Sequence, residues 1–136
     1  MKLVAAALIT AVAVSACSNT PKVYENRQWS DHFAFRITVD PSPPRAIEDA
    51  KYKIVVQDKT TGEPIETGEG RIFATSKDGA NTDDGLAKGK EVGTYYGRLF
   101  FPTTGDWAVA LQFRRDSTQR LERVDWVQAV NNPSEN

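Results

Sequence analysis

Apolar side chains alternate with polar or small ones along several short stretches of this chain, and this alternation constrains the fold more than any other feature. The clearest example runs from Tyr95 to Phe101, passes through the turn residues Pro102 to Asp106, and resumes from Trp107 to Phe113. A period of two residues is typical of strands with one buried face, and a turn between two such runs indicates a hairpin. The sequence therefore predicts paired strands in the second half of the chain.

Further alternating stretches occupy most of the rest of the chain. They lie at residues 29–39, 50–57, 64–67, 71–75 and 121–130, and a proline-rich run at 41–44 indicates a sheet edge or a crossing loop. No stretch after the first twenty residues has the period of an amphipathic helix. About seven short strands separated by turns predict an all-β fold, an immunoglobulin-like antiparallel β-sandwich. A closed barrel is the alternative.

Residues 76–92 lack any apolar period and contain three glycines. The pattern predicts one long loop, and loops of this length are often functional. Within it, the segment from Asp78 to Gly85 gathers oxygen-bearing side chains that could attract calcium. Ala80 and Thr82 fall where a calcium-binding loop requires ligands, however, so the segment does not meet that pattern.

The first residues have the pattern of an export signal. Met1 and Lys2 are followed by an apolar run from Leu3 to Val14, which is shorter than the roughly 20 residues that a membrane-spanning helix needs. The stretch Val14-Ser-Ala-Cys17 resembles the lipobox of bacterial lipoproteins. That resemblance implies that Cys17 receives a diacylglycerol and becomes the first residue after cleavage. An ordinary signal peptide with an incidental cysteine is the alternative.

These observations predict four segments. A signal peptide spans 1–16, a lipidated N-terminus and flexible tether 17–28, a β-sandwich domain 29–131, and a disordered tail 132–136. Ser18 follows the cysteine where lipoproteins kept at an inner membrane usually have Asp. The resemblance therefore implies a cell-envelope protein anchored through Cys17, at the periplasmic face of the outer membrane if the host has two membranes.

Charge and cysteine content limit what the domain can do. The chain carries 17 basic and 18 acidic side chains, a net charge of −1, which argues against the concentrated positive surface that nucleic-acid binding requires. Cys17 is the only cysteine, so no disulfide can brace the domain. Three Trp, six Phe and four Tyr can provide the buried area that the fold needs instead.

Two segments resemble the FixH-like and YtkA-like bacterial domains. One, Gly93 to Val109, has a tyrosine, a tight glycine turn and a following tryptophan, and the other, Tyr52 to Ile65, has a strand and an Asp-x-x-x-Gly-x-Pro turn. The resemblance covers about residues 33 to 113 and implies an exported immunoglobulin-like domain. Relatives with this architecture bind copper through His and Met. Here the only His is His32 and the only Met is Met1, so we expect no metal and no cofactor.

Catalytic groups are scarce. His32 is the only candidate for a histidine base. Ser30 and Asp31 are its sequence neighbours, but adjacent side chains on a strand point to opposite faces. The chain has no Gly-x-Ser-x-Gly elbow. Asp83 and Asp84, or Glu66 and Glu69, could in principle form a carboxylate pair, but nothing in their spacing selects them. We therefore expect a protein that is not an enzyme.

The remaining candidates form an interaction surface rather than an active site. Its predicted members are three aromatic and two acidic side chains: Trp29, Tyr96, Phe100, Asp83 and Asp84. Aromatic residues are enriched at binding patches. We expect a non-catalytic accessory module that binds a cell-envelope protein partner. The alternative is a lipoprotein that binds a glycan or small ligand by stacking it on the exposed aromatics.

Overall fold

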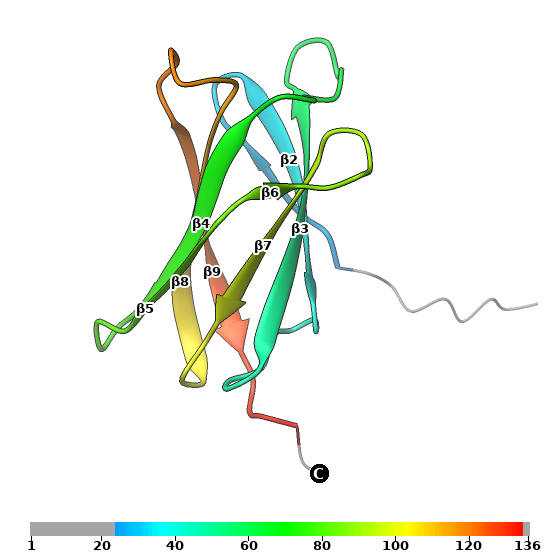
Figure 1. The fold of residues 1–136 in the computed structure, drawn as a ribbon. Coiled ribbons are helices and arrows are strands. Elements are labelled where there is room, and N and C mark those ends of the chain that lie inside the picture. The colour runs from blue at the N-terminus through cyan, green and yellow to red at the C-terminus, as the bar shows by residue number, and fades with distance from the viewer. Residues whose placement is uncertain (1–23, 135–136) are drawn as a thin grey trace, which may run out of the picture.

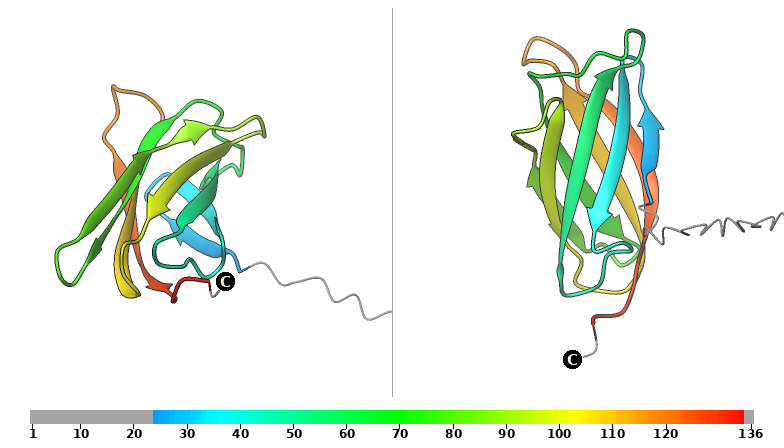
Figure 2. Two further views of the ribbon diagram at one scale, coloured as in Figure 1. Left: turned by 60° about the horizontal axis from the view of Figure 1, so that its bottom comes forward. Right: turned by 90° about the vertical axis from the view of Figure 1, so that its right-hand side faces the viewer.

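The computed structural model describes residues 24–134, which form nine β-strands in two antiparallel sheets packed face to face (Figures 1 and 2). One sheet has the strand order β1-β2-β3-β7-β6, and the other has the order β5-β4-β8-β9. The predicted all-β antiparallel sandwich is confirmed. The closed-barrel alternative is wrong for these residues. The strands are β1 (Asn26–Trp29), β2 (Phe33–Asp40), β3 (Asp49–Asp58), β4 (Glu69–Ser76), β5 (Asn81–Gly85), β6 (Ala87–Lys88), β7 (Thr94–Phe100), β8 (Gly105–Arg114) and β9 (Glu122–Val130).

The predicted strand over residues 29–39 is two strands. A turn at residues 30–32 separates β1 from β2, and the two then pair in antiparallel fashion with Trp29 opposite Ala34. The Ser30 N–H donates to the Phe33 carbonyl at 3.0 Å, and the Phe33 N–H donates to the Ser30 hydroxyl at 3.3 Å. Serine commonly supports such turns through its side chain. Residues 26–28, predicted as part of the tether, therefore belong to the sheet.

The prediction of one long loop over residues 76–92 is wrong. Strand β5 pairs with β4 over its whole length, and β6 pairs with β7. The sequence of β5, Asn-Thr-Asp-Asp-Gly, is polar on both of its faces. An edge strand of this kind obtains its stability from backbone pairing, so it needs no apolar alternation and leaves none to detect.

Three smaller differences follow from local contacts. Residues 64–67 form no strand, and Pro64 makes only an isolated bridge to Gln57. Nine strands replace the expected seven or so because β1, β5 and β6 are short or polar. At the other end of the chain, Ser134 lies in the predicted disordered tail, yet its hydroxyl donates to Glu48 at 2.7 Å and accepts from Arg45 at 2.6 Å.

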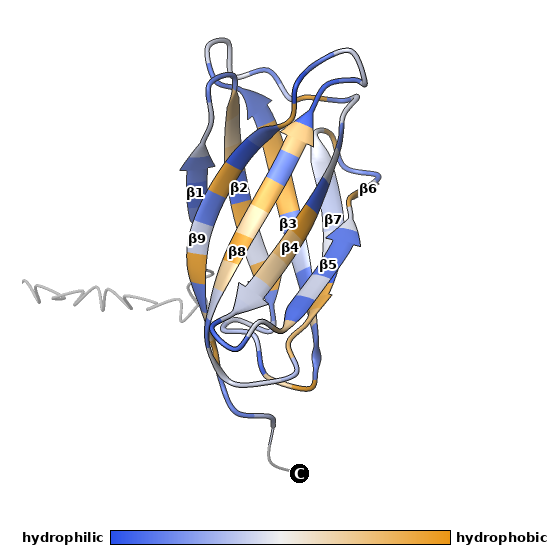
Figure 3. Ribbon diagram, turned by 90° about the vertical axis from the view of Figure 1, so that its left-hand side faces the viewer, coloured by the Kyte–Doolittle hydropathy of each residue, from blue (hydrophilic) through white to orange (hydrophobic). Residues whose placement is uncertain are grey.

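Aromatic side chains from both sheets fill the space between them. Phe113 on β8 makes edge contacts with Phe33 on β2 and Tyr95 on β7, with ring centroids 5.0 and 5.1 Å apart. Trp107 packs against Phe101 at 5.2 Å, and its indole N–H donates to the Thr103 carbonyl at 3.0 Å. Apolar residues alternate with polar ones along the strands, as Figure 3 shows by colour. The core is thus held by side-chain packing across the sheets.

The prediction of a hairpin from Tyr95 to Phe113 is wrong. Both strands form, but β7 pairs with β3 and β6 in one sheet and β8 pairs with β4 and β9 in the other, so the turn between them crosses from sheet to sheet. Two glycines accommodate this crossing. Gly105 begins β8 with φ of 110°, a backbone conformation that favours glycine. Gly97 lies under the opposite sheet, where an added Cβ would come within 2.8 Å of the Ile72 Cγ2 atom. A side chain at position 97 would therefore push the two sheets apart.

Tyr95 combines core packing with a buried hydrogen bond. Its hydroxyl donates to the Ile65 carbonyl at 2.8 Å, and burial raises its pKa. We predict that Tyr95→Phe lowers the free energy of unfolding by about 1–3 kcal/mol, because the Ile65 carbonyl loses its donor. Urea unfolding followed by tryptophan fluorescence measures the loss. Tyr96→Phe is the control, since the Tyr96 hydroxyl makes no hydrogen bond among the described residues, and equal losses in both variants would contradict the prediction.

Candidate functional site

The two open sides of the sandwich differ in how the backbone groups at the sheet edges are hydrogen-bonded. On the side where β5 lies beside β7, two side chains accept hydrogen bonds from the free edge of β7. The Asp84 carboxylate accepts from the Arg98 N–H at 2.8 Å, and the Thr82 hydroxyl accepts from the Phe100 N–H at 3.1 Å. This side therefore has its backbone donors satisfied where β6 ends.

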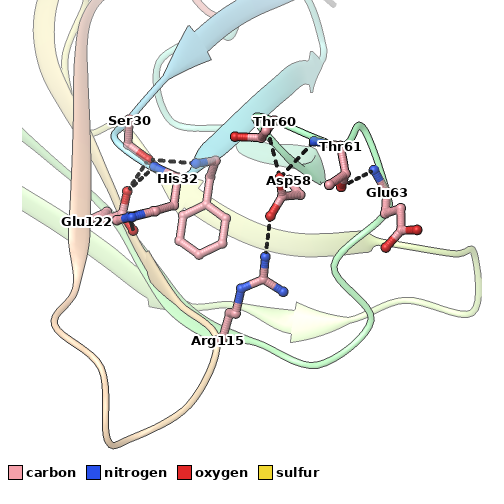
Figure 4. Close-up of polar contacts among 9 residues, drawn as sticks. Ser30, His32, Asp58, Thr60, Thr61, Glu63, Arg115 and Glu122 are labelled. Atoms are coloured by element: carbon pink, nitrogen blue, oxygen red, sulfur yellow. Dashed lines mark hydrogen bonds and ion pairs between the residues drawn. The ribbon is translucent and has the colours of Figure 1, made fainter.

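On the opposite side, β9 lies beside β1 and β2 (Figure 3). Contacts join the two sheets here at the top of the sandwich as drawn in Figure 1. Glu122, the first residue of β9, accepts hydrogen bonds from the Ser30 hydroxyl at 2.7 Å and from the His32 N–H at 2.8 Å, and it lies 3.1 Å from His32 Nδ1. We call this set the upper latch, and Figure 4 shows it.

Backbone hydrogen bonds join the same side at the bottom. The Asn131 N–H donates to the Pro44 carbonyl, and the Ala46 N–H donates to the Asn131 carbonyl, both at 2.9 Å. We call this set the lower latch. Its partners Pro44 and Ala46 lie at the end of the proline-rich run at residues 41–44 and just after it, and the sequence predicted this run as a sheet edge or crossing loop. The side is therefore closed at both ends and open between them.

The opening between the latches is a groove of about 850 Å³. Its floor is Tyr52, whose hydroxyl donates to the Gln128 side-chain oxygen at 3.3 Å and whose ring centroid lies 6.5 Å from that of Trp126. Burial raises the pKa of Tyr52 well above its usual value. We call this opening the β2–β9 groove, and its lining includes Tyr24, Ile37, Val39, Tyr52, Trp126 and Val127.

Strand β2 has an uncovered edge in this groove because β1 is shorter than β2. The last pair of the β1–β2 ladder is Asn26 with Ile37. The Phe33 carbonyl points toward β1, whereas the His32 carbonyl accepts from Lys59 on the β3 side. Backbone groups alternate sides along a strand, so the N–H and carbonyl of Val39 point toward the β1 side, beyond the end of that strand. No side chain among residues 24–134 accepts a hydrogen bond from the Val39 N–H.

The polar cluster at the top of the sandwich does not have the geometry of a hydrolytic triad. In a triad the hydroxyl donates to the imidazole, but Ser30 donates to Glu122 instead. His32 is exposed, with 77% of its side chain accessible, and it lies in the turn rather than in a strand. Nearby, Asp58 accepts from the Thr60 and Thr61 N–H groups and pairs with Arg115 at 2.6 Å. Hydrogen bonds from those two N–H groups lower the pKa of Asp58, and these contacts organise the loops (Figure 4).

The predicted interaction residues do not form one surface. Trp29 and Phe100 are exposed and Tyr96 is half-buried, and none of their rings stacks on another within residues 24–134. Asp83 and Asp84 point to opposite sides of β5, where Asp83 pairs with Arg71 at 2.8 Å and Asp84 caps β7. Of the five, only Tyr96 lines the β2–β9 groove. Cys17 lies outside the described residues.

Sequence reasoning missed most of the groove. In the sequence, Val39 and Tyr52 fall at alternating apolar positions like those of ordinary core residues. Only Val127, an apolar residue with 70% of its surface exposed, differs from the polar residues expected on the solvent-facing side of a strand. The proline-rich run was the one usable signal, because proline is confined to sheet edges and loops. It indicated the edge, but it did not indicate that β1 would leave part of that edge uncovered.

No group of three or more His, Cys, Asp or Glu side chains in residues 24–134 is placed to hold a metal ion. No helix in that part of the chain is long and apolar enough to cross a bilayer.

No protein-family model matches this chain, and no curated protein matches it. The fold is similar to the crystal structure of a DUF4426 family protein from Pseudomonas aeruginosa PAO1. The two superpose with a TM-score of 0.61 at 9% sequence identity, over 81% of this chain and 97% of that one. At this identity the similarity shows the fold alone: an all-β sandwich.

Asp84 and Asp83 provide a matched pair of variants. We predict that Asp84→Ala lowers the free energy of unfolding by about 0.5–1.5 kcal/mol, because the Arg98 N–H loses its acceptor. Asp83→Ala removes only an exposed ion pair and should cost about 0.5 kcal/mol or less. Urea unfolding measures both losses, and hydrogen exchange of the Arg98 amide should accelerate in the first variant alone. Equal exchange rates in both variants would contradict the capping role.

The upper latch should respond to pH. Burial raises the pKa of Glu122, but hydrogen bonds from Ser30 and His32 outweigh that effect and leave its pKa below the usual value of 4.5. A lowered carboxylate pKa stabilises the fold above the unfolded-state pKa, and this contribution is lost as pH falls through the folded-state pKa. We predict that Glu122→Gln costs about 1 kcal/mol at pH 7 and progressively less below pH of about 4.5.

Urea unfolding between pH 7 and pH 3 tests this dependence. Glu63→Gln is the control, because the exposed Glu63 side chain makes no hydrogen bond or ion pair in the described part of the chain. A Glu122→Gln loss that stays constant across the pH range would show that the charge of Glu122 contributes nothing to the latch.

Proposed function

We propose that this protein is a lipid-anchored, non-catalytic interaction module of the bacterial cell envelope. The observation that carries the proposal is the Val14-Ser-Ala-Cys17 stretch after a short apolar run, seven residues ahead of Tyr24 at the β2–β9 groove. Several acyl chains anchor a protein firmly, whereas one alone binds marginally. The anchor would hold the domain, with its apolar groove, near the membrane where a protein partner resides.

The polar contacts support a binding role over a catalytic one. The only histidine is exposed and bonded to a carboxylate that also takes the nearby serine hydroxyl. A general base needs its lone pair directed at the proton that it removes. The groove, by contrast, is lined by apolar and aromatic side chains of the type that forms protein interfaces.

We also propose a relationship to exported immunoglobulin-like domains of the FixH-like and YtkA-like type. Support comes from the segment that crosses from β7 in one sheet to β8 in the other, in which Tyr95 and Trp107 are buried and Gly105 has positive φ. The copper-binding role of relatives is not part of the proposal, because the chain has too few His and Met residues for such a site.

Mass spectrometry of the protein extracted from membranes tests the anchor. We predict that the chain begins at Cys17 and carries a diacylglycerol on that sulfur, since small residues precede it as the lipobox requires. The Cys17→Ala variant should retain residues 1–16 or leave the membrane fraction. An unmodified Cys17 thiol in the mature protein would overturn the lipoprotein assignment.

Photo-cross-linking in intact cells tests the interaction. A photoreactive amino acid at exposed position 127 should give a reproducible adduct with an envelope protein. The same group at Lys77, in the turn between β4 and β5, serves as the control. Adducts at both positions, or at neither, would argue against a binding role for this side of the domain.

A further inference from the structure

We propose that the β2–β9 groove binds an extended segment of a partner protein, which adds to β2 as a strand in line with β1. In this arrangement the added strand has apolar side chains facing the groove and a basic side chain opposite Asp40. The inference rests on the proposed function as an interaction module and names the chemical class of its partner.

The β1–β2 ladder provides the template. Strand β1 covers β2 only as far as Ile37, and within residues 24–134 the backbone of Val39 continues the same edge without a hydrogen bond to Tyr24 or to any other residue on that side. On the other side of the sandwich, the corresponding free donors of β7 are satisfied by Asp84 and Thr82. Exposed strand edges pair readily with another extended chain. The unfilled edge at Val39 is therefore where a strand of another protein fits.

The lining of the groove determines which type of side chain is favoured on the inner face of the added strand. Successive residues of a strand point to opposite faces, so a residue paired with Val39 would share its inward direction. There it would meet Val39, the Tyr52 ring and Trp126, which line the groove. An apolar side chain would bury area at this position without leaving a polar group unpaired. Apolar residues are expected at every second position of the segment.

Asp40 determines which charge is favoured on the outer face of the added strand. It is exposed, and no cation lies within 4.0 Å of its carboxylate among the described residues. Lys51, its neighbour in the β2–β3 ladder, has its ammonium 5.0 Å from the centre of the Tyr96 ring, and Lys53 pairs with Glu91 at 2.9 Å. Opposite charges on directly paired residues stabilise a sheet, so a Lys or Arg opposite Asp40 is favoured.

Hydrogen exchange of the full-length protein in phosphatidylcholine nanodiscs tests the proposal. The probe is an acetylated and amidated heptapeptide of alternating lysine and valine. It should slow amide exchange at Val39, whose N–H points toward the added strand. The same peptide with N-methylated valines cannot form the ladder and should give no protection. A glutamate-valine peptide should bind about two- to fivefold more weakly, as expected for a surface charge pair.

Charge reversal supplies the matched variants. Asp40→Lys should reverse the preference in favour of the glutamate-valine peptide. Asp78→Lys makes the same change in net charge in the turn between β4 and β5, away from the groove, and should leave the preference unchanged. An equal effect of both variants would show that only net charge matters, which would overturn the assignment of Asp40.

Other outcomes also decide the question. Protection elsewhere, equal protection by the N-methylated peptide, or protection that rises with protein concentration in the absence of peptide would each overturn strand addition by a partner; the last would indicate a second copy of this chain. If Cys17 is acylated and position 127 cross-links while the peptide gives no protection, strand addition fails and the proposed function stands. If Cys17 is unmodified, the peptide experiment still tests strand addition, because the groove is formed by the β-sandwich itself.

Discussion

The packing of Phe113 against three aromatic rings is the contact on which the rest of this structure depends. Its ring lies within 6.0 Å, centre to centre, of Phe33, Phe35 and Tyr95, so one β8 side chain contacts both β2 and β7 of the opposite sheet. Because Cys17 is the only cysteine, no disulfide can take over this role. The space is also tight on the β8 side, where a Cβ at Gly68 would come within 2.2 Å of the Phe113 ring.

With the sheets fixed face to face, their edges become the variable part of the fold. Backbone donors at a free edge need acceptors or water. On one side, β5 provides acceptors through side chains rather than through its backbone. On the other side, the upper and lower latches join the ends of β9 to the first sheet, and the C-terminal end of β2 at Val39 is left uncovered between them. Within residues 24–134, the β2–β9 groove is thus a place where a backbone donor at a sheet edge, the Val39 N–H, has no acceptor.

The strands with one apolar face could be predicted from the sequence because burial imposes the two-residue period directly. That holds for β2, β3, β7, β8 and β9. The polar strand β5 and the short strand β1 could not be found in this way, since their stability depends on pairing with β4 and β2. The same limit applies to the site: Asp84 is visible as an acidic residue, but its role as a cap for Arg98 depends on how the two sheets are placed, since β5 and β7 lie in different sheets. The groove depends on where β1 ends, which no periodicity encodes.

The two latches also limit how many residues of another chain can bind on this side of the domain. Strand β9 spans nine residues, or about 30 Å at 3.3 Å per residue, and both of its ends are occupied by contacts within the domain. A segment in the groove must therefore bend away or end within that span, and it can direct only two or three side chains inward. So short a recognition element binds weakly when free in solution. Holding both molecules at one membrane surface would raise their effective concentration and compensate for the small contact.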